Sequence, residues 1–128
     1  MKPKQKAKTK WPPYEYQRVF IKSFRSVANR VYKNSAEKGF WDGGMLRNRA
    51  EMIALMHSEL SEALEALRGE RKLMDEHIPT HTNLEVELAD CVIRIMDFSA
   101  GFGLNVGEAI IKKMEYNRKR PHRHGKVF

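Results

Sequence analysis

The sequence predicts an all-α protein whose four main helices form a bundle. Apolar residues recur at intervals of three and four in four separate segments, which is the spacing of amphipathic helices. No segment alternates apolar and polar residues for long enough to predict a strand. The chain has 128 residues, 41% hydrophobic and 31% charged, which fits one compact domain.

The first two helices are separated by a glycine-rich loop. The first follows Pro13 and is expected to run to about Lys38, where Gly39 stops it. Residues 39–44 are predicted to be a loop. The second helix is expected over 45–67, a segment with neither Pro nor Gly. One arc of it is predicted to face the core: Ile53, Met56, Leu60, Leu64 and Leu67.

The third and fourth helices begin at capping signatures. Thr82 followed by Glu85 has the form of a capping box, and the helix after it is expected to end at the glycines of 101–103. Asn105 opens the fourth helix, which should end before Pro121. The third helix is apolar nearly all round, which is typical of a buried helix.

The positive charge is concentrated at the two ends of the chain. The net charge is +8, but residues 1–10 carry +5, residues 112–128 carry +6 and residues 11–111 carry −3. We expect residues 1–13 to be a disordered, solubilising tail and residues 14–128 to be the domain. Nucleic acid is expected to bind only weakly, through the Lys-rich tail, if at all.

Neither a membrane nor an oxidising compartment is indicated. No apolar run approaches the roughly 20 residues that span a bilayer, and the Lys-rich start lacks the apolar region of a secretory signal. Cys91 is the one cysteine, so no internal disulfide can form. The sequence therefore predicts a cytoplasmic protein.

Two pairs of acidic residues lie on apolar helices. Glu59 and Glu62 are three residues apart on the second helix, and Glu87 and Asp90 have the same spacing on the third. This spacing puts each pair on one helix face. If the two helices pack together, four carboxylates meet, and such an all-oxygen cluster suits Mg²⁺ or Mn²⁺. The alternative is that each acid pairs with a Lys or Arg side chain.

Two other features bear on this interpretation. A ferritin-like di-iron bundle would need Glu-x-x-His pairs. Here the fourth residue of each pair is an acid, Glu62 or Asp90, and not His. On the fourth helix, Lys113, Asn117 and Arg120 form one line of hydrogen-bond donors suited to phosphate oxygens. The alternative for that line is a basic last turn of a solvated helix.

These motifs together resemble a known family. The segments are 56–65 with Glu-x-x-Glu, 87–94 with Glu-x-x-Asp after a spacer of 24 residues, and 113–121 with Lys-x-x-x-Asn-x-x-Arg. Over about residues 40–126 the chain resembles the short, single-domain, MazG-like all-α nucleoside triphosphate pyrophosphohydrolases. The Lys-rich tail has no counterpart in that pattern.

The resemblance implies Mg²⁺-dependent cleavage of a (deoxy)nucleoside triphosphate between its α- and β-phosphates, which yields the monophosphate and pyrophosphate. Carried over by position, four residues would be the catalytic metal ligands: Glu59, Glu62, Glu87 and Asp90. Three would contact phosphate: Lys113, Asn117 and Arg120. Arg94, one turn after Asp90, would face the same cleft and bind substrate. Housekeeping of the nucleotide pool would be the cellular role.

Trp41 and the surplus apolar surface lead to two further expectations. Trp41 lies in a glycine-flanked loop and is a candidate to stack on the substrate's base, the alternative being a core aromatic. The apolar faces of the second and third helices exceed what four helices can cover, which predicts a homo-oligomer, a dimer or tetramer.

The rival to an enzyme is a small basic helical module that binds nucleic acid, and a structural subunit is the third possibility.

Overall fold

The computed structural model describes residues 10–127 and is all-helical over that range. Short 3₁₀ turns, η1 and η2, follow α1 and α4. Within residues 10–127 there is no strand, only an isolated bridge between Met74 and Thr82. The predicted all-α class is therefore confirmed. The elements are α1 Tyr14–Glu37, η1 Gly44–Leu46, α2 Arg49–Leu67, α3 Asn83–Gly101, α4 Val106–Lys119 and η2 His122–Gly125.

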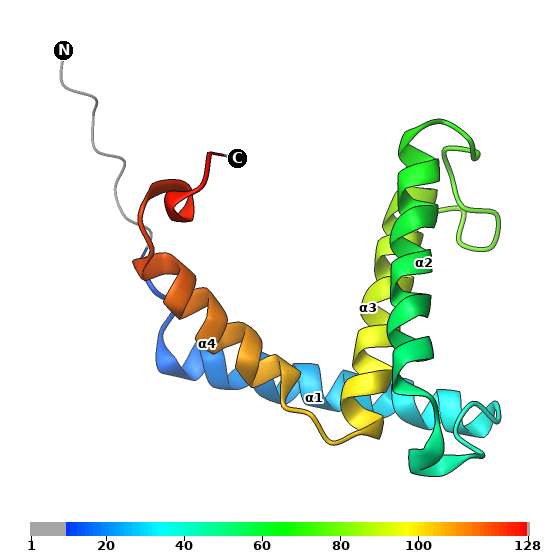
Figure 1. Ribbon diagram of the computed structural model, residues 1–128, viewed down its shortest axis with the longest axis horizontal. Coiled ribbons are helices and arrows are strands. Elements are labelled where there is room, and N and C mark those ends of the chain that lie inside the picture. Colours follow the sequence, from blue (N-terminus) through cyan, green and yellow to red (C-terminus); the bar gives the residue numbers. More distant parts are fainter. Residues whose placement is uncertain (1–9, 128) are drawn as a thin grey trace. The chain divides into compact units, whose positions relative to one another are not determined.

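The described chain divides into two compact units. One contains residues 10–24 and 106–127, and the other contains residues 25–105. Helix α1 supplies its first part to one unit and its second part to the other (Figure 1). Residues 1–9 of the predicted tail lie outside the described range, and the single domain expected over 14–128 stays a prediction.

The starts of α2 and α3 are set by side-chain caps. Asn48 Oδ1 accepts hydrogen bonds from the backbone N–H groups of Ala50 and Glu51, at 3.0 and 3.1 Å. Helix α2 therefore begins at Arg49, four residues later than predicted, because residues 44–46 form a 3₁₀ turn instead. The capping box of Thr82 and Glu85 is present as predicted and fixes the start of α3.

Helices α2 and α3 pack side by side and run in opposite directions (Figure 1). The buried residues of α2 are Met52, Glu59 and Ala63, which recur at intervals of seven and four and therefore share one face. On α3 the buried residues include Glu87 and Cys91. Two of these five buried side chains are acidic, so the seam between the helices is partly polar.

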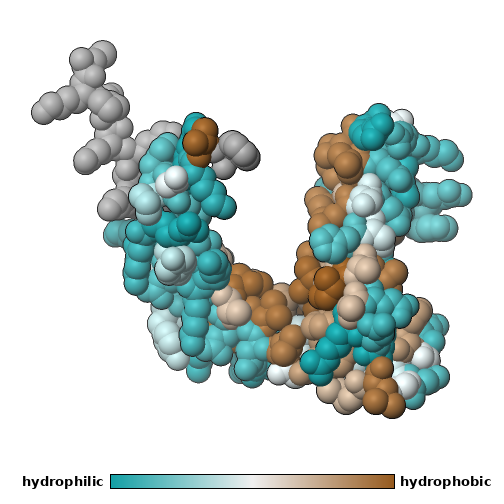
Figure 2. Space-filling view, in the orientation of Figure 1, coloured by the Kyte–Doolittle hydropathy of each residue, from teal (hydrophilic) through white to brown (hydrophobic). Residues whose placement is uncertain are grey.

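The core face predicted for α2 is wrong. Leu60, Leu64 and Leu67 are 47%, 55% and 68% exposed, because α2 turns the face with Glu59 toward α3 and leaves the leucine-rich face uncovered. On α3, Leu88 and Val92 are exposed as well. Figure 2 shows hydrophobic residues gathered on the surface of this helix pair.

An aromatic cluster joins the last part of α1 to the end of α3. The Trp41 ring lies edge-on to Tyr32 and Phe102, with ring centroids 5.1 and 5.2 Å apart. Gly101 permits this packing, because a Cβ at that position would lie 2.1 Å from Trp41 Cη2. Gly101 is thus required for close packing, as well as lying at the predicted end of the helix.

The unit formed by residues 10–24 and 106–127 pairs the first part of α1 with α4. Gly107 is buried, and a Cβ there would lie 3.1 Å from Phe24. The Arg118 guanidinium lies 5.6 Å from the centre of the Trp11 ring. Trp11, assigned to the tail by the sequence, therefore has a partner in α4.

Candidate metal centre

Three of the four predicted ligands converge between α2 and α3. One carboxylate oxygen from each of Glu59, Glu87 and Asp90 lies within 4.8 Å of the other two. Glu59 and Glu87 are buried, whereas Asp90 is partly exposed. Two of the acids are therefore buried between α2 and α3, and the third is accessible to solvent.

The three oxygens lie close to the spacing that a small, hard cation requires. Octahedral Mg²⁺ binds oxygen at about 2.0–2.1 Å, so ligands on opposite sides of the ion are about 4.2 Å apart. The 4.8 Å limit in the protein is close to that span. Three carboxylates leave the remaining positions of an octahedron for water and phosphate oxygens.

Glu62 is linked to this cluster through a residue that the sequence analysis did not select. Arg71 Nη2 donates to Glu62 Oε2 at 2.8 Å, and Arg71 Nη1 donates to Glu87 Oε1 at 2.6 Å. Glu65 Oε2 lies 3.4 Å from Arg71 Nη2. The hydrogen bond that Arg71 donates to Glu62, together with the charges of the surrounding carboxylates, raises the pKa of Arg71 above its ordinary value, so the guanidinium stays charged.

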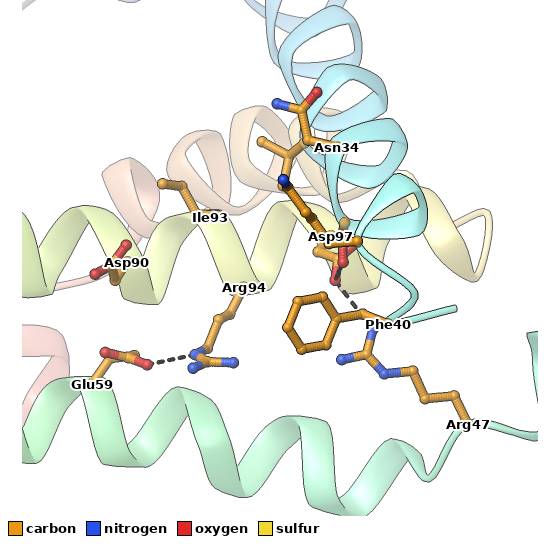
Figure 3. Close-up of a pocket in the computed structure, with 11 residues that line it drawn as sticks. Asn34, Phe40, Arg47, Glu59, Asp90, Ile93, Arg94 and Asp97 are labelled. Atoms are coloured by element: carbon orange, nitrogen blue, oxygen red, sulfur yellow. Dashed lines mark hydrogen bonds and ion pairs between the residues drawn. The ribbon is translucent and has the colours of Figure 1, made fainter. Parts of the chain in front are cut away.

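Arg94 is paired with the other side of the cluster. Its Nε donates to Glu59 Oε1 at 2.5 Å, across the seam from α3 to α2 (Figure 3). Arg94 was predicted to face the same cleft as the acids, and it does. The pairing with arginine therefore applies to Glu59, Glu62 and Glu87, while the convergence of Glu59, Glu87 and Asp90 is compatible with a bound cation.

Burial and mutual repulsion perturb the acids of α3. Burial raises the pKa of Glu87, and the Glu62 carboxylate raises it further, while Arg71 opposes both effects. Burial also raises the pKa of Asp90, followed by the charge of Glu59, against the effect of Arg94. Bringing these negative charges together thus costs free energy, which a bound cation would offset.

The Asp90→Asn variant should be more stable than the wild type in the absence of divalent cations at pH 7. The pKa of Asp90 is raised in the folded state. The folded wild type therefore loses stability as the pH rises from the ordinary carboxyl range through that raised pKa, whereas the variant does not. Solvent screens part of the repulsion, because Asp90 is partly exposed. We expect a rise in Tm of about 3 °C, the shift that roughly 1 kcal/mol produces in a domain of this size.

Thermal unfolding in EDTA at pH 4 and pH 7 measures this effect. The difference between variant and wild type should shrink as the pH falls from 7 to 4, because protonation of Asp90 in the folded state relieves the repulsion. A variant that melts below the wild type at pH 7 in EDTA would show that the Asp90 charge stabilises the fold.

About two turns beyond Asp90 on α3, Asp97 joins three elements of the same unit. Its Oδ1 accepts from Trp41 Nε1 at 2.9 Å, and its Oδ2 accepts from Ser35 Oγ at 3.0 Å. Arg47 Nη1 donates to Oδ2 at 3.3 Å. This buried carboxylate therefore ties α1 and the loop before α2 to α3.

A cavity of about 460 Å³ opens beside the carboxylates. Its volume lies within the roughly 300–1,000 Å³ of small-molecule sites. Glu59, Asp90 and Arg94 form part of its wall, and Phe40 and Arg47 line it near Asp97 (Figure 3). The cavity thus combines the acids with cationic and aromatic side chains.

Trp41 does not present its ring to this cavity. It is 7% exposed and its indole N–H is bonded to Asp97, so the prediction that it stacks on a base is not supported, and the alternative of a core aromatic describes it. The neighbouring Phe40 is 63% exposed and lines the cavity. The aromatic ring available to a ligand comes from the same loop, one residue earlier.

The predicted phosphate contacts of α4 lie in the other unit. Lys113 and Arg120 flank the ring of Tyr116, with Nζ at 4.7 Å and Cζ at 5.8 Å from its centre. Asn117 Oδ1 is buried without a hydrogen-bond partner. Their role toward the carboxylates stays a prediction.

Sequence reasoning missed Arg71 and Phe40 because neither follows a helical period. Arg71 lies in the connection after α2, where only the path of the chain decides which acid it meets. The acids near the end of α2, Glu62 and Glu65, precede a basic loop, and this pattern could have predicted that a loop arginine pairs with them. Phe40 carried a weaker signal, since a large aromatic in a Gly-rich loop has no helix face to occupy.

Comparisons with protein-family models, with curated proteins and with solved structures find no match to this chain. No helix in the described range is both long and apolar enough to cross a bilayer.

Proposed function

We propose that this protein is a Mg²⁺-dependent nucleoside triphosphate pyrophosphohydrolase, which cleaves a (deoxy)nucleoside triphosphate to the monophosphate and pyrophosphate. The observation that carries the proposal is the convergence of Glu59, Glu87 and Asp90 beside a cavity. Glu59 and Asp90 line that cavity, together with Arg94 and Phe40. Carboxylates suit the ion, the guanidinium suits phosphate, and the ring suits a base. The motif order of the MazG-like family agrees with this assignment.

Each side chain has a role in this proposal. Glu59, Glu87 and Asp90 would hold Mg²⁺, with Mn²⁺ as a substitute, and Glu62 would join them once it is released from Arg71. The ion, when bound, neutralises phosphate charge and polarises a water molecule. One of these carboxylates can accept the proton of the attacking water. Arg94 positions the phosphates, and Phe40 stacks on the base.

A panel of canonical and modified nucleoside triphosphates tests this function. Pyrophosphate and the monophosphate should appear with Mg²⁺ and should not appear with EDTA. Release of inorganic phosphate instead would place the cleavage at the γ-phosphate and contradict the proposal. The same panel identifies the preferred base and sugar.

We also propose that the working unit is a homodimer or a dimer of dimers. The exposed leucines of α2 and the exposed Leu88 and Val92 of α3 form apolar surface that a second copy would cover. Light scattering at micromolar concentration should give a mass at least twice 15.0 kDa. Leu60→Lys should lower that mass, whereas Ser61→Lys, an exposed neighbour on the same helix, should not. A fully active 15.0 kDa monomer would overturn the proposal.

A second candidate function is supported by the other unit. Lys10, Trp11, Arg118 and Arg120 line one pocket there, a combination of cations and an aromatic ring that suits single-stranded nucleic acid. This function predicts binding that weakens steeply with salt. Deleting residues 1–10 should abolish binding that depends on the tail and leave nucleotide hydrolysis intact. Strong binding without hydrolysis would favour this second function.

A further inference from the structure

The charged Arg71 side chain binds two of the four predicted ligands, Glu62 and Glu87, as a metal ion would. Its guanidinium contacts carboxylates from two helices at once, Glu62 of α2 at 2.8 Å and Glu87 of α3 at 2.6 Å. Glu87 is also one of the three residues whose oxygens converge. The same buried carboxylate therefore pairs with Arg71 and also belongs to the candidate metal centre.

The backbone on both sides of Arg71 is anchored. Glu70 N–H donates to the Glu65 carbonyl at 3.1 Å, and Asn83 N–H donates to the Leu73 carbonyl at 3.0 Å. The Asn83 side chain also donates to the carbonyl of Lys72. Since the loop is held at both ends of this short segment, the long Arg71 side chain can leave the carboxylates without unfolding the loop.

Charge balance makes the two positive groups competitors. The Arg71 guanidinium offsets the repulsion between Glu62 and Glu87, which is the same repulsion that a divalent ion would relieve. A carboxylate oxygen bound to a guanidinium gives up part of its ability to bind a metal, because both need the same lone pairs. The arginine is partly exposed, at 32% of its side chain, so water can take over its hydrogen bonds when it leaves.

We propose that Arg71 is a built-in counter-cation that a divalent ion displaces from Glu62 and Glu87. This inference rests on the proposed function, because it assumes that the cluster binds a metal. Arg71 keeps the acids paired while the ion is away, and binding of the ion frees the guanidinium on the edge of the cluster. The affinity of the site for the ion is thereby set lower than the carboxylates alone would give.

The test compares Mn²⁺ binding by the whole protein, followed through the electron paramagnetic resonance signal of free Mn²⁺ and without nucleotide. Arg71→Gln should bind Mn²⁺ about tenfold more tightly than the wild type, because the charged competitor that bridges Glu62 and Glu87 is gone. Arg71→Lys, which keeps the charge but cannot form the bridge, should lie between them. Arg68→Gln is the matched control: it removes the same charge from the same segment, but Arg68 is paired with Glu70, at 3.0 Å, outside the cluster. Its affinity should stay within about twofold of the wild type.

Thermal unfolding gives a second readout. Arg71→Gln should melt below the wild type in EDTA, because its acids are unpaired, and should gain more in Tm from Mn²⁺. If Arg71→Gln does not fold in EDTA, the comparison of Arg71→Lys with the wild type decides the question.

The outcomes separate this inference from the function on which it rests. Binding of Mn²⁺ by the wild type with equal or weaker binding by Arg71→Gln would overturn the role of Arg71 and leave the metal site standing. No Mn²⁺ binding by any of the variants or the wild type would overturn both.

Discussion

Glu59→Gln is expected to lower the rate of pyrophosphate release by on the order of 10²–10³-fold, the loss typical of removing one group that stabilises charge in the transition state. Glu59 supplies one of the three converging oxygens, and the amide has a similar shape but no charge for the ion. Its amide oxygen can still accept from Arg94 Nε, so we expect the fold to survive.

Steady-state assays with Mg²⁺ and a circular dichroism melt measure the two effects separately. Glu51→Gln is the matched control, because Glu51 lies on the same helix and is exposed. It should retain full activity. A Glu59→Gln protein that is folded and fully active would exclude the carboxylate cluster from catalysis.

Asp97→Ala is expected to lower the free energy of unfolding by about 3–5 kcal/mol, the usual cost of removing one partner from a buried ion pair. The substitution leaves Arg47 without its carboxylate and Trp41 Nε1 without its acceptor. Asp97→Asn should cost less, because its amide oxygen can still accept one hydrogen bond. Asp97 lines the same cavity as Phe40 and Arg47, so the wall of that cavity should loosen as well.

Urea unfolding followed by circular dichroism measures this loss. Glu37→Ala is the control, since Glu37 is exposed at the end of α1, and its effect should stay within about 0.5 kcal/mol. Equal stability of Asp97→Ala and the wild type would show that the three hydrogen bonds contribute nothing net to folding.

Helix positions were predictable because they depend on neighbours in the sequence. The capping box at Thr82 and the glycine after α1 act over three or four residues, and both predictions agree with the structure. The start of α2 was missed by four residues, because residues 44–46 form a 3₁₀ turn and Asn48 caps the helix.

The face that α2 buries was not predictable from periodicity. Hydrophobicity favours Leu60 and Leu64 on the inside, yet α2 turns Glu59 toward α3. The pairing of Glu59 with Arg94 accounts for part of this choice, and that pairing depends on how two helices meet. A pattern in one helix carries no information about the charges on its neighbour.

The candidate site was predicted in part for the same reason. The three-residue spacing of Glu87 and Asp90 is local, and the structure brings both to Glu59. Arg71 reaches Glu87 only because a loop of the right length follows α2, and Trp41 is buried because Asp97 accepts its N–H. Both contacts join residues that are far apart along the chain.

The most direct test of the account is anomalous diffraction at the manganese edge, from crystals grown with Mn²⁺ and a non-hydrolysable α,β-substituted nucleotide. We expect an anomalous peak that places Mn²⁺ within bonding distance of carboxylate oxygens of Glu59, Glu87 and Asp90, with the nucleotide's phosphates on the open side of the ion. A nucleotide bound elsewhere, or no anomalous peak among these three residues, would contradict it.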